Sequence, residues 1–239
     1  MKNIAIITAG GSGKRIKSKI KKQFIEIMGR PLLFWTIDKF ADHPDINQII
    51  ITLPQDELKI YKTLIEKEYR DFAISIIAGG KQRQDSVYNA LALCSENTNL
   101  VLIHDGVRPF ISQDEISKLI KKAQHKEAVI PVSKVKNTIK KIKQDKVIKT
   151  IQREDLVNVF TPQIFQYKLI KQCHDKAKKI GIYCTDDAAL LEHFGYIVST
   201  LECSSHNFKI TDQFDLEIAK FILKNSLLKE SKIRHDKQD

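Results

Sequence analysis

Glycines followed by cations are the first residues whose types and spacing could do chemistry. Gly10, Gly11 and Gly13 come directly after an apolar run. Arg15 and Lys22 follow among other basic residues. Because glycine lacks a Cβ atom, backbone N–H groups there can approach an anion closely, and nearby cations neutralise the charge that the amides cannot. The stretch therefore predicts a loop that holds phosphate groups.

Two familiar phosphate loops do not fit this segment. A Walker A loop needs Ser or Thr after Gly13-Lys14, but Arg15 stands there. Thr8 also occupies the place of its first glycine. A dinucleotide fingerprint needs a third small residue, and Ile16 occupies that position. A glycine turn with solvated lysines remains an alternative for this stretch taken alone.

Two later segments also join glycine to charge. In residues 79–86 two glycines could form a narrow passage for the flat base of a nucleotide, to which Ser86 would donate a hydrogen bond. The alternative is that these residues are the ordinary start of a helix. In residues 105–109 a tight turn carries Asp105 and Arg108. Asp105 could bind a polyol hydroxyl or a magnesium-bound water, and the alternative is an ion pair that only stabilises the turn.

The elements that must position these groups alternate between strand and helix. The strands are nearly continuous apolar runs, which indicates an α/β fold with a mostly parallel sheet covered on both faces. Because ligands bind at the carboxyl ends of such strands, the three segments should meet at one edge. The expected strands are 3–7, 49–53, 73–78, 100–104, 128–132 and 196–201, and the expected helices are 31–40, 56–69, 85–94, 112–125, 165–180 and 213–223.

Local signals support several helix ends. Ser112 followed by Glu115 predicts a capping box, and Pro31 suits the first turn of its helix. Thr185 is expected to cap a further helix that begins with two aspartates.

Residues 135–153 break the alternation. Polar and apolar residues alternate on both sides of a turn at 144–146, which predicts a two-stranded hairpin. An isolated hairpin is marginal in water, so this arm should pack on something such as a second subunit. The alternative is a hairpin at the edge of the main sheet.

Composition indicates a single domain with anionic partners. The chain has 239 residues and a net charge of +11, which fits nucleotides, sugar phosphates or nucleic acid. No zinc finger or basic zipper is present, so we expect no nucleic-acid partner. Residues 1–225 should form the domain, and the basic tail 226–239 should fray into solvent.

The sequence also indicates where the protein works. No apolar run approaches the length of a membrane span, and the N-terminus enters a strand almost at once. The four cysteines have no metal-binding spacing and are expected to be reduced thiols. We therefore expect a cytoplasmic protein without a membrane partner.

A series of short motifs resembles a known family. The first loop reads Ala-Gly-Gly-x-Gly-x-Arg and is followed by Lys-Gln-Phe. Gly-Gly-x-x-Arg-x-x-Ser-Val, His-Asp-Gly-x-Arg-Pro, Asn-Thr-Ile-Lys, Thr-Pro-Gln-x-Phe, Thr-Asp-Asp-Ala and Asn-x-Lys-Ile-Thr then occur in this order. Together they resemble the 2-C-methyl-D-erythritol 4-phosphate cytidylyltransferase family over residues 3 to about 223. The resemblance implies a Rossmann-like three-layer sandwich that forms a homodimer through a protruding β-arm.

The resemblance also implies an activity and site residues. CMP would pass from cytidine triphosphate (CTP) to the polyol phosphate with release of pyrophosphate, and magnesium would bind mainly through the triphosphate. The transition state would be stabilised by Arg15, Lys22 and Lys209. CTP would be bound by Ala9, Gly10, Gly11, Gly80, Lys81, Ser86 and Gly106. The polyol phosphate would be bound by Asp105, Arg108, Thr161 and Thr185, and by Thr138 and Arg153 from the partner's arm.

Other functions stay open at this point. A ribitol 5-phosphate cytidylyltransferase shares fold and loop, although the Thr-Asp-Asp-Ala motif favours the methylerythritol enzyme. A nucleotide-binding protein without catalysis would have the same scaffold. The chain departs from the family at Thr8, Lys21, Gly106 and Val157, which affects loop shape more than charge.

Overall fold

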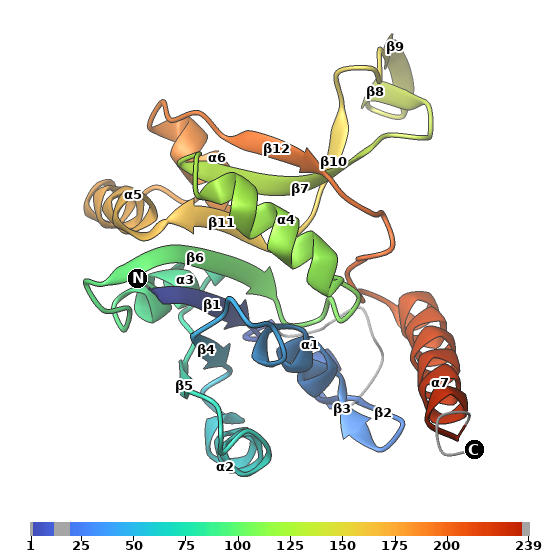
Figure 1. The fold of residues 1–239 in the computed structure, drawn as a ribbon. Coiled ribbons are helices and arrows are strands. Elements are labelled where there is room, and N and C mark those ends of the chain that lie inside the picture. The colour runs from blue at the N-terminus through green and yellow to red at the C-terminus, as the bar shows by residue number, and fades with distance from the viewer. Residues whose placement is uncertain (1, 12–19, 236–239) are drawn as a thin grey trace.

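The computed structural model describes residues 2–11 and 20–235, with side chains as far as residue 226. Within this part an eight-stranded sheet forms the centre, in the order β10-β7-β11-β6-β1-β4-β5 with β12 paired to β7 (Figure 1). Its strands are β1 (Lys2–Thr8), β4 (Gln48–Leu53), β5 (Ile74–Ala78), β6 (Thr98–Asp105), β7 (Ala128–Lys134), β10 (Val157–Val159), β11 (Gln163–Gln166) and β12 (Ser199–Glu202).

Most neighbouring strands in this sheet are parallel. β1 pairs in parallel with β4 and β6, β4 with β5, and β7 with β12. β11 lies between β6 and β7 and runs against both, and β10 runs against β7. The predicted mostly parallel α/β sheet is confirmed, and β1, β4, β5 and β6 have their carboxyl ends at one edge.

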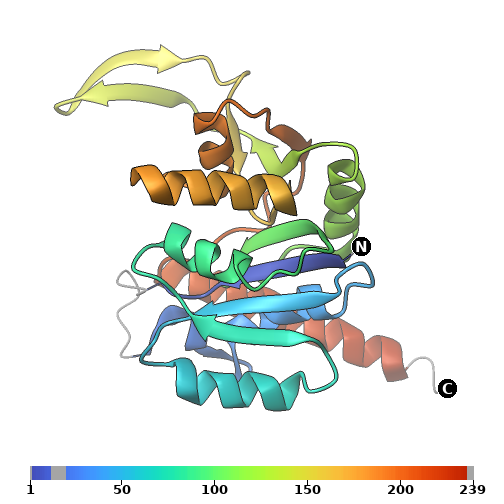
Figure 2. The ribbon, with the colours of Figure 1, turned by 90° about the vertical axis from the view of Figure 1, so that its left-hand side faces the viewer.

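Helices cover both faces of the sheet, and Figure 2 shows α3 and α5 on the same side. Side chains of a strand alternate between faces. Ala5 and Ile7 of β1 accordingly pack in the core beneath α1, α2 and α4, while Ile4 and Ile6 pack in the core beneath α3, α5 and α6. The helices are α1 (Leu32–Ala41), α2 (Leu58–Glu68), α3 (Arg83–Leu91), α4 (Gln113–Ala123), α5 (Tyr167–Ile180), α6 (Asp187–His193) and α7 (Gln213–His235).

The start of α1 differs from the prediction. A two-stranded ribbon of β2 (Glu26–Ile27) and β3 (Arg30–Pro31) precedes the helix. Met28 and Gly29 make its turn with φ of 55° and 74°. Pro31 therefore ends a strand and precedes α1 instead of lying in its first turn. The capping box of Ser112 and Glu115 at α4 is confirmed.

The second half of the chain holds further differences. The helix predicted from 165 begins at Tyr167, because Gln163–Gln166 is taken into the sheet as β11. The strand predicted over 196–201 is Ser199–Glu202. α7 continues to His235, so the tail is helical as far as the structure describes it. Leu, Lys and Glu in that stretch are good helix formers, which explains the extension.

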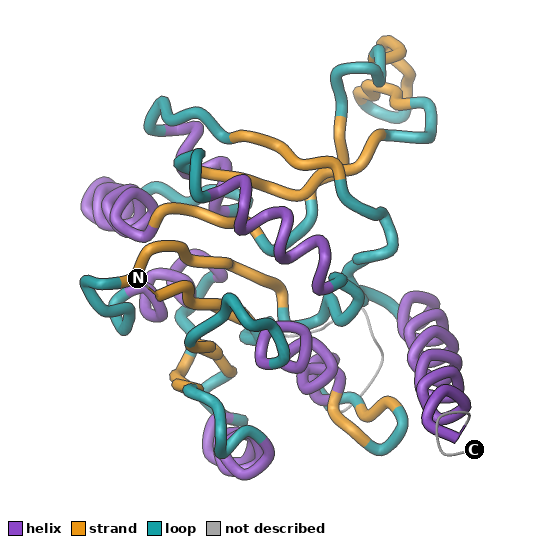
Figure 3. Tube along the Cα trace, viewed as in Figure 1, coloured by secondary structure: helices purple, strands orange, loops and turns teal. Residues whose placement is uncertain are grey.

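The predicted hairpin forms the arm, residues 135–153. Its strands β8 (Ile139–Lys143) and β9 (Lys146–Ile151) make a two-stranded sheet of their own, so the alternative of an edge hairpin on the main sheet is wrong. Gln144 and Asp145 have positive φ, as a tight hairpin turn requires. Figure 3 shows loops on both sides of the arm, which projects away from the sheet.

None of the helices in the described residues is both long enough and apolar enough to span a bilayer.

Candidate functional site

A cleft of about 360 Å³ lies at the edge of the sheet where β1, β5 and β6 end. The expectation that the three glycine-containing segments meet is confirmed, because each contributes to its wall. A fourth contribution comes from Lys209, which precedes α7. The described lining residues are Thr8, Ala9, Gly10, Gly11, Lys22, Gln23, Gly80, Lys81, Gln82, Arg83, Ser86, Asp105, Val107 and Lys209.

The first loop is held in place by hydrogen bonds to its backbone. Ala9 N donates to Thr52 O of β4 at 2.9 Å. Gln23 Nε2 donates to Ala9 O at 2.6 Å and to Gly11 O at 3.2 Å. Gly10 and Gly11 are exposed at the mouth of the cleft. Arg15, which was predicted to act on the triphosphate, lies outside the described residues.

Lys22 reaches the cleft from the short 3-10 helix Lys22–Phe24. It is 9% exposed, and its Nζ donates to Ile210 O at 3.2 Å. Lys21 instead turns to an ion pair with Asp56 on the surface. The packing of Lys22 against residue 210 brings it to the same wall as Lys209, although 188 positions separate Lys22 from Ile210 in the sequence.

The second loop passes very close to the start of α3. A Cβ atom on Gly80 would lie 2.2 Å from Asp85 Cβ, so this position requires glycine. Ser86 Oγ accepts from Gly80 N at 3.0 Å and donates to Gln82 O at 3.2 Å. Ser86 therefore stabilises the helix start, as the alternative interpretation had it, and also lines the cleft beside the exposed Lys81.

Asp105 is the buried centre of an ionic cluster. Its side chain is 9% exposed, and Oδ2 lies 3.1 Å from Arg108 Nε and 3.0 Å from Lys209 Nζ. Oδ1 lies 3.4 Å from Arg83 Nε. Burial alone would raise the pKa of Asp105, but the three cations hold that pKa well below its usual range. Asp105 is therefore ionised at neutral pH and does more than pair with Arg108 within its own turn.

Several predicted residues lie behind or beside the cleft. A Cβ atom on Gly106 would lie 2.9 Å from Leu33 Cδ1, so Gly106 faces the core. Thr161 Oγ1 accepts from Asp105 N at 3.1 Å and contacts His104 Nδ1 at 3.1 Å, which holds the Asp105 backbone. Burial lowers the pKa of His104 to about 4, so its ring is neutral.

The structure does not bring the remaining predicted residues into the cleft of the same chain. Thr185 is exposed, and the N-cap of α6 is Asp186, whose side chain accepts from Ala189 N. Thr138 and Arg153 are exposed on the arm, where Arg153 Nη1 donates to Lys136 O.

Sequence reasoning missed Arg83 and Asp187. Arg83 is the first residue of α3 and Asp187 the first of α6, and Arg83 Nη1 lies 2.6 Å from Asp187 Oδ2. Both residues belong to the quoted motifs Gly-Gly-x-x-Arg-x-x-Ser-Val and Thr-Asp-Asp-Ala. The motifs could have singled them out, but nothing local indicates that the two side chains meet.

The cleft offers little to a metal ion by itself. The part of the chain that the structure describes has no group of three His, Cys, Asp or Glu residues that could hold one. Asp105 is the carboxylate among the described lining residues, and cations surround both of its oxygens. The described lining therefore supplies few of the oxygen ligands that a magnesium ion prefers.

Glycine loops and clustered cations at the carboxyl edge of a mostly parallel sheet place the chain among the α/β proteins that bind ligands at this edge. The family model described as IspD, 2-C-methyl-D-erythritol 4-phosphate cytidylyltransferase, matches residues 3–225. The chain therefore belongs to this family, which is a family of nucleotidyltransferases.

Individual relatives agree with the family match. Proteins with the same description from Clostridium botulinum (strain Langeland) and Clostridium perfringens (strain SM101) are 42% and 43% identical to this chain. These alignments cover 93% of this chain and 97% and 99% of the relatives.

Solved structures show the same fold. The 4-diphosphocytidyl-2C-methyl-D-erythritol synthase of Anaerococcus prevotii is 35% identical, with a TM-score of 0.82 over 93% of this chain and 98% of that one. The 2-C-methyl-D-erythritol 4-phosphate cytidylyltransferase of Thermus thermophilus is 29% identical, with a TM-score of 0.77 over 94% of this chain and 100% of that one.

Proposed function

We propose that this chain transfers CMP from CTP to 2-C-methyl-D-erythritol 4-phosphate, which gives 4-diphosphocytidyl-2-C-methyl-D-erythritol and pyrophosphate. The observation that carries the proposal is the cleft, in which two glycine loops face Lys22 and Lys209 beside an ionised Asp105. Such a site suits two polyanions that must be brought together.

The reaction needs no general base. The acceptor phosphate is ionised at neutral pH, so its oxygen attacks the α-phosphorus of CTP in line while pyrophosphate leaves. The obstacle is repulsion between the two anions. Arg15, Lys22 and Lys209 would neutralise this charge and hold the reacting groups in position. Magnesium on the triphosphate supplies further positive charge.

Each wall of the cleft has a separate task. Ala9, Gly10 and Gly11 would present backbone N–H groups to the triphosphate. Gly80, Lys81 and Ser86 would bind the nucleoside part of CTP. Because Gly80 has no side chain, it would leave a flat surface for the base. Asp105 would accept hydrogen bonds from acceptor hydroxyls, and Arg108 and Thr161 would keep Asp105 in place.

The arm supports a homodimer as part of the proposal. Ile142, Val147 and Ile148 are 63%, 61% and 56% exposed on a hairpin that has no core of its own. Exposed apolar side chains grouped in this way favour a protein partner. A second copy would cover them and bring Thr138 and Arg153 to the acceptor phosphate in the other subunit's cleft.

The test is pyrophosphate release with each of four nucleoside triphosphates and with both methylerythritol and ribitol phosphates. We expect turnover with CTP and the methylerythritol phosphate, and loss of turnover when magnesium is chelated. Preference for ribitol phosphate would indicate the alternative acceptor. CTP binding without pyrophosphate release from any pair would indicate a non-catalytic protein.

The proposal also includes a cytoplasmic location and the absence of a nucleic-acid partner. Cell fractionation should place the protein in the cytoplasm. Duplex DNA or RNA should bind weakly or not at all. Strong binding that falls steeply with salt concentration would instead indicate a charge-driven nucleic-acid-binding protein.

A further inference from the structure

The two oxygens of Asp105 are engaged unequally. Oδ2 receives Arg108 Nε at 3.1 Å and Lys209 Nζ at 3.0 Å. Oδ1 has only Arg83 Nε at 3.4 Å among the described residues, which is longer than an ordinary charged hydrogen bond. Oδ1 is therefore the oxygen with capacity left for a further hydrogen bond.

Arg83 does not close on Oδ1 because another carboxylate holds it. Arg83 Nη1 lies 2.6 Å from Asp187 Oδ2, a much shorter contact than the one to Asp105. The side chain of Asp187 is 2% exposed, so water does not screen this attraction as it would at the surface. The guanidinium is thus shared unequally between two buried carboxylates, and Asp187 has the larger share.

Asp187 is itself fixed in position. Gln163 of β11 donates to Asp186 Oδ2 at 2.7 Å and accepts from Ala188 N at 3.0 Å, which ties the first turn of α6 to the sheet. His174 of α5 is 1% exposed and its Nε2 lies 3.4 Å from Asp187 Oδ1. The carboxylate therefore cannot follow Arg83 toward the cleft.

We propose that Asp187 is a positioning residue that keeps Arg83 from closing on Asp105 Oδ1 and so keeps this oxygen available to a hydroxyl group of the acceptor. The inference rests on the proposed function, in which Asp105 binds the polyol. Without the Asp187 charge, Arg83 would turn fully to Asp105 and compete with the hydroxyl for Oδ1. The loss should fall on the acceptor and spare CTP, because Asp187 does not line the cleft.

A double-mutant cycle on Arg83→Lys and Asp187→Asn tests this mechanism, with kcat and both KM values measured at each corner. We expect Asp187→Asn alone to raise the acceptor KM about tenfold and to leave the CTP KM within about twofold. In the Arg83→Lys background, Asp187→Asn should change the acceptor KM by less than about twofold, because no guanidinium remains that could turn to Asp105. Equal effects in both backgrounds, or an unchanged acceptor KM in Asp187→Asn, would overturn the proposal.

Arg83→Lys alone is a second test if Asp187→Asn does not fold. Lysine keeps a charge for Asp187 and removes the Nε contact to Asp105, so the acceptor KM should stay within about threefold of the wild type. A tenfold rise would show that Arg83 itself supports the acceptor and would overturn the proposal.

Asp38→Asn is the matched control. Asp38 of α1 also pairs with an arginine, at 3.0 Å from Arg30 Nη2, but neither residue lines the cleft. This variant should lose stability without any change in acceptor KM. A wild-type chain that is inactive with every polyol phosphate would defeat the proposed function and this inference together, whereas an active wild type with an unaltered Asp187→Asn variant would defeat the inference alone.

Discussion

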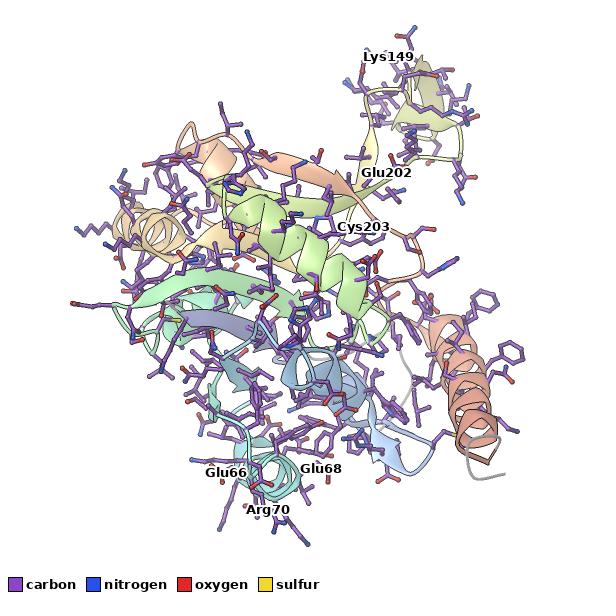
Figure 4. The ribbon with its side chains drawn as sticks, viewed as in Figure 1. Glu66, Glu68, Arg70, Lys149, Glu202 and Cys203 are labelled. Carbon is purple, nitrogen blue, oxygen red and sulfur yellow. The ribbon has the colours of Figure 1, made fainter. Side chains whose placement is uncertain are left out.

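The side chain of Asp105 in the cleft is 9% exposed, whereas every residue from 140 to 150 on the arm is exposed. Both regions are rich in charge. In the cleft three cations lie 3.0–3.4 Å from the oxygens of Asp105, and this carboxylate is largely removed from water. On the arm, lysines such as Lys149 point into solvent away from the sheet (Figure 4).

Burial decides where charge can act in this protein. Interactions between buried charges are strong and costly to break, while exposed charges are screened and contribute little. The cleft should therefore govern catalysis and stability within one chain. The arm should matter only when another surface covers it.

Lys22→Ala should have the largest effect on activity. Removing one well-placed cation should lower kcat by about 10²–10³, while CTP binding weakens far less. Steady-state kinetics and calorimetric titration with CTP would separate the two quantities. Lys59→Ala on the exposed surface of α2 is the control. Equal losses in kcat and binding would contradict a transition-state role for Lys22.

Asp105→Asn should have the next largest effect, on stability as well as turnover. Removing a buried carboxylate from its three cations should lower the free energy of unfolding at pH 7 by roughly 3–5 kcal/mol. Because the pKa of Asp105 is lowered by folding, its contribution is fully present above the unfolded pKa of about 4 and is lost progressively as the pH falls from there toward the much lower folded pKa.

Denaturant unfolding at pH 7 and at pH 3.5 would check this sign. The variant should lose less stability on acidification than the wild type. A parallel loss in both proteins would mean that Asp105 does not contribute to the pH dependence.

Ile148→Lys would test the arm. The side chain is 56% exposed in one chain, so the charge should cost little stability there, but it would be buried in the proposed dimer. Light scattering after size-exclusion chromatography should show a dimer for the wild type and a monomer for the variant. A monomeric wild type would refute the dimer.

Lys149→Ala should have the smallest effect. An exposed lysine with no ion pair among the described residues should change the free energy of unfolding by less than about 0.5 kcal/mol. Thermal unfolding beside the wild type would measure it. A larger change would mean that Lys149 makes a stabilising contact beyond those of a single chain.

Much of the fold could be predicted because its signals are local. The apolar run of β1, the capping box at Ser112 and the turn of the arm each depend on residues a few positions apart. The glycine loops were predicted for the same reason, since the need for a close backbone approach is visible in the residue type itself. Strand β11 was missed because four residues next to a helix carry no pattern that separates them from it.

The amino-acid sequence shows which groups are available: the alternation typical of a parallel sheet, the glycines, the cations and the carboxylate of Asp105 at the end of β6. How these groups meet depends on the tertiary fold. Arg83 and Asp187 are 104 positions apart, and Lys22 and Ile210 are 188 apart, so no spacing rule relates them. The order of strands and the hydrogen bonds between β11 and the start of α6 place Asp187 against Arg83, and burial there decides how strongly their charges act.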